Sequence, residues 1–258
     1  MKTILVTGGT GNLGKEVVHQ LINKSYQVSI LSSQQNLEFD KAVEIFKGDL
    51  GENTGLVEAM ADADIIVHCA SSPKDPQKID IEGTGNLLAA IDKNKTRHFI
   101  YISIVGVDKS DYPYYQAKYK VEKMIAESGL PYSILRTTQF HSFIYNMIKS
   151  FVSDDNSIQI PQGMRFQPIE LKEVAVRIVQ LVENGATGLL PHTGGPQVLS
   201  IEDMVLSYLN IFGLHQIFQP MPIGSPRYDL FRSGINLCPA NAVGLTTWEE
   251  FLGRQFDN

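Results

Sequence analysis

The sequence predicts an α/β protein built on a doubly wound parallel sheet with a small C-terminal lobe. Two observations carry this prediction. Strand-like apolar segments alternate with helical patterns along the first 136 residues, and a glycine-rich turn stands between the first strand and the first helix. Connections of this length require right-handed crossovers, which place helices on both faces of the sheet. With 258 residues, the chain can hold one large domain of this class.

The first strand, turn and helix occupy the start of the chain. Residues 4–6 are an apolar run of the kind that is buried on both faces of a sheet. Apolar residues recur at helical spacing from residue 13 to residue 22, which predicts a helix over 12–23. The turn between them carries four glycines: Gly8, Gly9, Gly11 and Gly14.

The remaining elements follow from the same two periodicities. Further strands are expected at 27–31, 43–46, 65–69, 99–103 and 132–135. Helices are expected at 53–61, 80–93, 114–128, 141–152, 170–184, 201–212 and 247–253. Three segments rich in proline and glycine carry little strand pattern: 161–168, 191–198 and 220–240. We therefore expect residues 1–140 to form a nucleotide-binding core and residues 141–258 to extend the same domain over the strand ends.

Composition and net charge exclude several classes of binding partner. The net charge of −6, with no basic run, argues against nucleic acid or an anionic membrane as a partner. No apolar stretch approaches the roughly 18 residues of a membrane span, and a strand begins at residue 3, so we expect a cytoplasmic protein without a cleaved signal. The two cysteines fit reduced thiols, and no metal-ligand spacing occurs. A small, apolar molecule is the expected substrate, and the sequence leaves the oligomeric state open, a homodimer included.

The glycine turn predicts a nucleotide cofactor. Backbone N–H groups at a helix N-terminus attract a pyrophosphate, and glycines let the chain approach it closely. The spacing Gly8-x-x-Gly11-x-x-Gly14 differs from the plain G-x-G-x-x-G fingerprint, and glycines also serve tight turns for steric reasons alone. The placement between a buried strand and a helix favours the cofactor interpretation. The expected pyrophosphate contacts are Gly8, Thr10, Gly11, Asn12 and Leu13.

Ligands of such sheets lie beyond the carboxyl ends of the strands, so the residues that follow each strand are candidates. Ser32 and Ser33 follow the second strand, where an NAD site usually has an acidic residue and an NADP site an arginine. Because a carboxylate is missing there, the sequence favours NADP, with NAD as the alternative. After the next two strands, the candidate cofactor contacts are Asp49, Leu50, Cys69, Ala70 and Ser71. Asp49 could instead cap a turn, and Cys69 is more typical of packing than of a reactive thiol.

Tyr114 and Lys118 form the candidate catalytic pair. They are four residues apart, so on a helix they share one face, and the lysine ammonium lowers the pKa of the tyrosine phenol. Tyr114 would then act as general acid or base on a carbonyl or alcohol. Ser103, at the end of the preceding strand, would hold the substrate oxygen, and Lys118 could also bind the cofactor ribose. Tyr115 is the second choice for the acid.

Alternatives to these roles remain at two positions. A Tyr-x-x-x-Lys spacing on a helix is common and usually marks a solvated face. His141 could line a substrate cleft, although a lone histidine at a helix start is more often structural.

These residues together resemble the short-chain dehydrogenase/reductase superfamily, and within it the atypical NAD(P)H-binding branch related to NmrA. The segments that carry the resemblance are Gly8–Gly14, Asp80–Thr84, Ile102–Gly106, Tyr114–Lys118 with Glu122, Thr138–His141, Phe166–Pro168, Gly194–Pro196 and Thr247–Phe251. The resemblance spans essentially the whole chain. It implies a Rossmann-type fold, a nicotinamide cofactor on the glycine turn and a substrate lobe beyond residue 140.

Activity is a separate question, because that branch mixes reductases with non-catalytic redox sensors. Our first expectation is an NAD(P)H-dependent oxidoreductase that reduces a small carbonyl, quinone or enone. The alternative is a protein that binds the cofactor and signals its occupancy to a partner. An epimerase or dehydratase acting on a nucleotide-linked sugar is a weaker third option, because we find no basic set for a second pyrophosphate.

Overall fold

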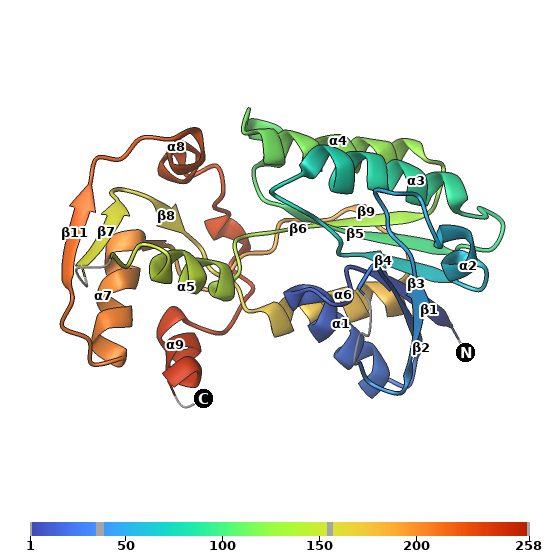
Figure 1. Cartoon of the computed structure of the whole chain (residues 1–258), viewed down its shortest axis with the longest axis horizontal. Helices are drawn as coiled ribbons and strands as arrows, with labels where there is room; N and C mark the ends of the chain where they lie inside the picture. The colour runs from blue at the N-terminus through green and yellow to red at the C-terminus, as the bar shows by residue number, and fades with distance from the viewer. Residues whose placement is uncertain (1, 35–38, 154–156, 257–258) are drawn as a thin grey trace. The chain divides into compact units, whose positions relative to one another are not determined.

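A seven-stranded sheet forms the centre of the protein, which we describe from a computed structural model (Figure 1). The structure describes residues 2–34, 39–153 and 157–256. The strand order is β3-β2-β1-β4-β5-β6-β9, and the strand pairs run parallel. The bounds are β1 (Thr3–Thr7), β2 (Gln27–Ser32), β3 (Val43–Lys47), β4 (Ile65–His68), β5 (His98–Ile104), β6 (Tyr132–Thr137) and β9 (Gly188–Leu189). The predicted doubly wound parallel sheet is confirmed.

Helices cover both faces of this sheet (Figure 1). One face carries α1 (Asn12–Asn23) and α6 (Leu171–Asn184). The other carries α2 (Leu56–Met60), the π-helical segment η1 (Gln77–Glu82), α3 (Gly83–Ala90) and α4 (Pro113–Glu127). Such coverage explains why the central strands are apolar on both faces.

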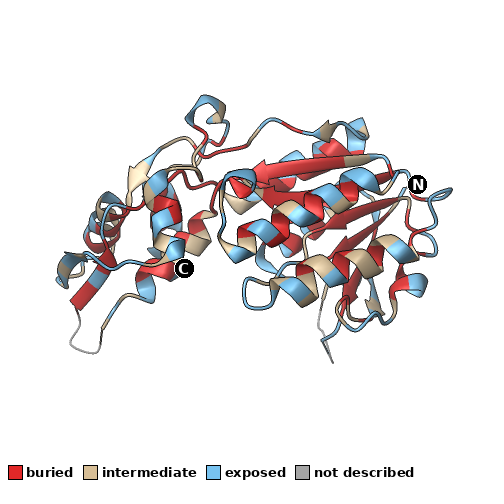
Figure 2. Cartoon of the chain, turned by 90° about the horizontal axis from the view of Figure 1, so that it is seen from above, coloured by how far each residue is buried: buried red, intermediate tan, exposed pale blue. Residues whose placement is uncertain are grey.

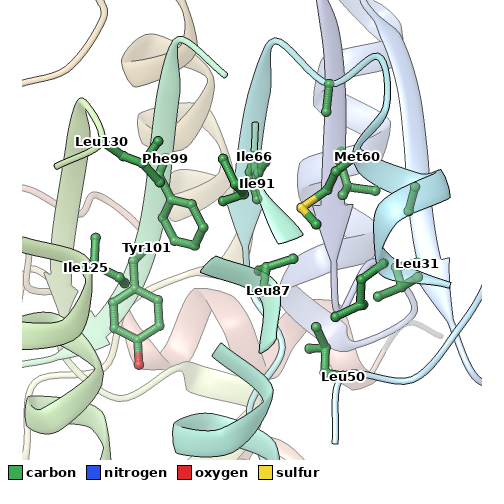
Figure 3. Close-up of a cluster of buried hydrophobic side chains, with 14 of the residues drawn as sticks. Leu31, Leu50, Met60, Ile66, Leu87, Ile91, Phe99, Tyr101, Ile125 and Leu130 are labelled. Carbon is green, nitrogen blue, oxygen red and sulfur yellow. The ribbon is translucent and has the colours of Figure 1, made fainter. Parts of the chain in front are cut away.

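The core between the sheet and helices α2, α3 and α4 is one cluster of buried side chains (Figure 3). Phe99 and Tyr101 from β5 pack there with Leu87 of α3 and Ile125 of α4. The inner strands β1, β2, β4, β5 and β6 are buried along most of their length, whereas the edge strands β3 and β9 are largely exposed (Figure 2). This rigid layer fixes the strand ends, at which the candidate site lies.

The chain divides into two compact units. The sheet unit contains residues 1–103, 113–135 and 174–190, so a segment well beyond residue 140 returns to the sheet. The second unit contains residues 104–112, 136–173 and 191–258. Its elements are η2 (Val107–Lys109), α5 (His141–Lys149), β7 (Ser157–Pro161), β8 (Arg165–Phe166), β10 (Leu199–Ser200), α7 (Ile201–Ile211), β11 (Ile217–Met221), α8 (Pro226–Ser233), η3 (Pro239–Asn241) and α9 (Trp248–Phe256).

The expected elements exist, with shifted ends. The helix expected over 53–61 is shortened to α2, because Gly55 adopts a left-handed φ of +69°. The helix expected over 80–93 begins as η1 and ends at Ala90. The expected helices over 201–212 and 247–253 are present, and the hydroxyls of Ser200 and Thr247 cap them by accepting hydrogen bonds from the backbone N–H groups three residues on.

The sequence analysis did not predict the strands β7 to β11 or the helix α8. Strands β7 and β11 pair with each other across a long stretch of chain, and α8 lies in a segment rich in proline and glycine. Among the described residues, no helix is long and apolar enough to cross a membrane.

Candidate active site

Two glycines of the turn after β1 are required by packing. Gly8 has a φ of +67°, and a Cβ atom there would lie 2.6 Å from the backbone nitrogen of Ala70. A Cβ atom on Gly14 would lie 2.1 Å from the carbonyl oxygen of Gly8. Both distances are far below van der Waals contact, so these positions exclude any side chain. The turn is thereby held against the end of β4.

Gly11 differs, because packing against the protein does not demand a glycine there. It is exposed, it is the N-cap residue of α1, and a Cβ atom on it would meet only the carbonyl oxygen of Gly8, at 3.3 Å. A side chain at this position would instead fill the open space in front of the helix N-terminus, between Thr10 and Asn12. Leu13 is buried, so it can offer only its backbone N–H. This cradle fits a pyrophosphate.

The residues at the end of β2 are compatible with a cofactor whose ribose carries a 2′-phosphate. Ser32 is buried, and its hydroxyl accepts a hydrogen bond from the backbone nitrogen of Gln34 at 3.2 Å. Ser33 and Gln34 are exposed. None of the three is acidic, so nothing at these positions would repel a 2′-phosphate.

Asp49 and Leu50, after β3, both have structural contacts. The Asp49 carboxylate accepts hydrogen bonds from the backbone nitrogens of Gly51 at 2.8 Å and Glu52 at 3.1 Å. Leu50 packs its side chain into the core, and its carbonyl oxygen accepts a hydrogen bond from Asn86. The turn-capping alternative for Asp49 is therefore what the structure shows.

At the end of β4, Cys69 is not activated. Burial raises the pKa of its thiol to about 12, although the nearby Lys118 ammonium acts in the opposite direction. The thiol therefore stays protonated at neutral pH, which fits a packing role. Ala70 presents its backbone to Gly8, and Ser71 is exposed.

A continuous polar chain links α4, the loop after β4 and η1. The phenol oxygen of Tyr114 lies 2.8 Å from Ser71 Oγ, and Ser71 Oγ donates to the Asp80 carboxylate at 2.5 Å. The second oxygen of Asp80 accepts a hydrogen bond from the backbone nitrogen of Ser72 at 2.9 Å. Lys118 Nζ lies 3.9 Å from the Asp80 carboxylate. Asp80 is therefore the centre of the network.

The donors in this chain can be assigned. A serine hydroxyl has one hydrogen, and an ionised carboxylate can only accept. Because Ser71 gives its hydrogen to Asp80, the oxygen of Ser71 is left as an acceptor, and Tyr114 must donate to it. The Tyr114 proton is thus held at a defined atom.

Lys118 is buried and held from three sides. Its ammonium donates to the carbonyl oxygen of Ile102 at 2.8 Å, approaches Asp80 and lies 4.3 Å from the centre of the Tyr101 ring. Burial lowers the pKa of Lys118, and the Asp80 carboxylate offsets part of that effect. Asp80 and Ser71 also connect Lys118 to Tyr114.

The other serine and tyrosine candidates occupy different surroundings. Ser103, at the end of β5, is buried, and its hydroxyl makes no hydrogen bond within the described part of the chain. Tyr115, the second choice for the acid, is buried and packs edge-on against Tyr114 at 6.4 Å.

His141, in the second unit, is structural in its contacts. It is buried beside the rings of Trp248, at 6.0 Å, and Phe251, at 5.1 Å, nearly parallel to both, and those two rings also stack on each other at 5.5 Å. Burial lowers its pKa to about 4, with a partial offset from the Ile169 carbonyl. The imidazole is therefore neutral at pH 7.

Two contributors to the sheet-unit site were not assigned roles in the sequence analysis. Asp80 stands in one of the segments that carry the family resemblance, but only the tertiary structure shows its carboxylate beside Ser71 and Lys118. The buried His68 accepts or donates at both ring nitrogens, to Thr7 at 2.6 Å and Thr84 at 2.9 Å. It thereby ties the strand before the glycine turn to α3. No spacing signal in the sequence marks it.

The chain belongs to the NAD(P)H-binding family, whose model matches residues 8–183. The predicted resemblance to atypical short-chain dehydrogenases/reductases is confirmed at the level of fold and family, and the nucleotide cofactor is NAD(P)H. The glycine turn and the strand ends described above lie within the matched residues.

Two curated relatives differ in what their names describe. The chain is 26% identical over 249 residues to a divinyl chlorophyllide a 8-vinyl-reductase of Cucumis sativus, covering 86% of this chain and 59% of that protein. It is 29% identical over 166 residues to the photosystem II assembly factor Ycf39 of Cyanophora paradoxa, covering 61% and 52%. This chain thus spans about half to three fifths of the length of these relatives.

Solved structures share the fold at low identity. An Escherichia coli NADPH-dependent quinone oxidoreductase, QOR2, in complex with NADPH aligns with a TM-score of 0.80 at 16% identity, over 98% of this chain and 99% of that one. A nucleoside-diphosphate-sugar epimerase of Staphylococcus aureus aligns with the same TM-score at 17% identity, over 98% and 100%. These similarities establish the architecture and leave the substrate to be argued from the site.

Proposed function

We propose that this protein is an NADPH-dependent reductase that reduces a small, apolar carbonyl, quinone or enone, with Tyr114 as the proton donor. The observation that carries the proposal is the chain Tyr114–Ser71–Asp80–Lys118, which holds a phenol proton at the strand ends beside the nucleotide cradle. The bound cofactor would supply a hydride to the substrate. The protein would supply the proton and the binding geometry.

Each residue of the chain has a defined task in this proposal. In this proposal the Tyr114 O–H turns from Ser71 Oγ to the hydride-reduced substrate and gives up its proton there. The Ser71 hydrogen then turns from Asp80 to the phenolate oxygen, so Ser71 keeps the ring oriented and becomes the donor to it. Asp80 is a positioning residue, because it fixes Ser71 as an acceptor and holds the Lys118 ammonium in place. The positive charge of Lys118 stabilises negative charge that develops along the chain. The unpaired hydroxyl of Ser103 is a further donor for a ligand oxygen at the end of β5.

The second candidate is a non-catalytic NAD(P)-binding regulator of the NmrA type. It is favoured by one observation, that the relative with 29% identity is named as an assembly factor rather than as an enzyme. In that case the polar chain would stabilise the fold and the cofactor-bound state without passing a proton to a substrate.

Measuring cofactor binding and then cofactor oxidation distinguishes the reductase from the non-catalytic regulator. Purified protein is titrated with NADPH and NADH, and cofactor oxidation is then followed on a panel of quinones, aldehydes and enones. The variants are Tyr114→Phe and Lys118→Ala, with Tyr115→Phe as the matched control on the neighbouring ring.

The reductase proposal expects turnover in the parent and in Tyr115→Phe, and a loss of about 100-fold or more in Tyr114→Phe with NADPH binding retained. Tight binding of NADPH without turnover on any acceptor favours the regulator. A parent that binds neither nucleotide contradicts both.

A further inference from the structure

Lys47 is the last residue of β3 and lies beside the end of β2. In the parallel register, Lys47 pairs with Ser32, and the backbone nitrogen of Gly48 donates to the carbonyl oxygen of Ser32 at 3.1 Å. Neighbouring strands are about 4.8 Å apart, so the Lys47 backbone stands one strand spacing from the residues that follow β2. Those residues form the ribose end of the nucleotide site described above.

The Lys47 side chain leaves the sheet on the face that carries the glycine turn. A Cβ atom on Gly9 would lie 2.5 Å from Ile30 Cγ2, so Ile30 points toward that turn. Side chains alternate along a strand, so Ser32 projects to the same side as Ile30. Residues in register on adjacent parallel strands share a face, which places Lys47 on that side too. The preceding residue, Phe46, packs on the core of the opposite face.

The backbone of Lys47 is held by a tight turn, whereas its side chain is exposed to solvent. A Cβ atom on Gly55 would lie 2.2 Å from the Lys47 carbonyl oxygen, so the turn after β3 closes tightly over this residue. The nearest acidic group after the strand, Asp49, has its carboxylate engaged by the backbone of its own turn. Lys47 is exposed and makes no ion pair with any residue that the structure describes. Its ammonium is therefore available to an anion beside Ser32.

We propose that Lys47 is the cation that holds the 2′-phosphate of NADP in this protein. The inference rests on the proposed NADPH dependence and adds its determinant, which lies on β3 rather than directly after β2. The 2′-phosphate carries up to two negative charges and accepts charge-assisted hydrogen bonds, which a lysine ammonium supplies. The hydroxyl of Ser33 and the absence of a carboxylate over Ser32–Gln34 complete a site that tolerates this phosphate.

The test is equilibrium binding, which needs no substrate. Isothermal titration calorimetry measures the Kd of NADPH and NADH, and of 2′,5′-ADP and 5′-AMP, where the members of each pair differ from each other in the 2′-phosphate alone. The variants are Lys47→Gln, which removes the charge, and Lys47→Arg, which keeps it. Lys41→Gln is the matched control, because Lys41 is exposed and precedes the amino end of the same strand.

The proposal expects the parent to bind NADPH more tightly than NADH. Lys47→Gln should weaken the binding of NADPH and 2′,5′-ADP about tenfold, with the Kd of NADH and 5′-AMP changed less than about twofold. Lys47→Arg should retain the preference, and added salt should weaken NADPH binding more in the parent than in Lys47→Gln.

Two results would overturn the inference alone: an unchanged NADPH affinity in Lys47→Gln, or equal losses for NADPH and NADH in that variant. In both, the preference of the parent for NADPH survives. A parent that prefers NADH overturns the proposed NADPH dependence together with the inference, and a parent that binds no nucleotide overturns the proposed function itself, so the failures are distinguishable.

Discussion

Replacing His141 by phenylalanine should make the second unit more resistant to acid. The histidine is 1% exposed and stacks against both Trp248 and Phe251. Neither of its ring nitrogens makes a hydrogen bond within the described residues. Phenylalanine keeps an aromatic ring in the stack and removes the titrating group.

The magnitude follows from the pKa of His141, which is 6.5 in an unfolded chain and about 4 in the fold because of burial. Between these values the unfolded state binds more protons, so the folded state loses stability as the pH falls. The contribution of the neutral imidazole is complete above pH 6.5 and is lost as the pH falls toward 4. One pKa unit is worth about 1.4 kcal/mol, so the loss between pH 7.5 and pH 5 is about 2 kcal/mol.

The assay uses the single tryptophan of the chain. Trp248 stacks on His141, so its fluorescence during urea unfolding reports on this unit. The free energy of unfolding is measured at pH 7.5 and pH 5 for the parent, for His141→Phe and for the exposed control His215→Gln. The parent and the control should lose about 2 kcal/mol more than His141→Phe on acidification. Because each protein is compared with itself, the cost of repacking the ring cancels.

Equal acid losses in the parent and in His141→Phe, within about 0.5 kcal/mol, would refute the reasoning. The buried His68 and His98, whose pKa values burial lowers to about 3 and about 4, titrate in the same direction. They belong to the sheet unit and are unchanged in the variant, so they contribute equally to both measurements.

Three further outcomes follow from the site. Gly14→Ala should destabilise the protein by about 3 kcal/mol or more and abolish NADPH binding, because the added Cβ atom would collide with the carbonyl oxygen of Gly8. Melting followed by circular dichroism measures the stability, and calorimetry measures the binding. The control is Gly253→Ala, whose Cβ atom would meet nothing within 4 Å. Asp80→Asn should cost about 3 kcal/mol, because the buried Lys118 loses its counter-charge, and an unchanged urea midpoint would contradict the network. Both cysteine thiols should react with a disulfide reagent slowly at pH 8 in the native protein and rapidly in urea, and fast native labelling would contradict their raised pKa values.

The sequence predicted the sheet unit well, because its signals are local. Strand-like apolar segments of three to five residues predicted the six main strands, and helical periodicity predicted α1 and α4 within a residue or two. The glycine turn could be recognised because Gly8 needs a positive φ and Gly14 packs on the carbonyl oxygen of Gly8, six residues earlier. The cap boxes at Ser200 and Thr247 are likewise contacts between residues three apart.

The second unit shows the limit of this approach. The short strands β7 and β11 pair only because distant segments meet, and each contains a proline, which argues against a strand in the sequence alone. The helix α8 contains a proline at its first position, which the sequence analysis associated with an irregular segment.

At the site, the sequence determined which chemical groups are present, and the tertiary structure decided which of them act together. The spacing of Tyr114 and Lys118 placed them on one helix face, as expected. In the fold, the Lys118 ammonium is buried, so it contacts the Ile102 carbonyl and the Asp80 carboxylate, and the Tyr114 phenol is bonded to Ser71. A buried charge must be matched by groups that are near in space, whatever their separation along the chain, and no local pattern in the sequence records that requirement.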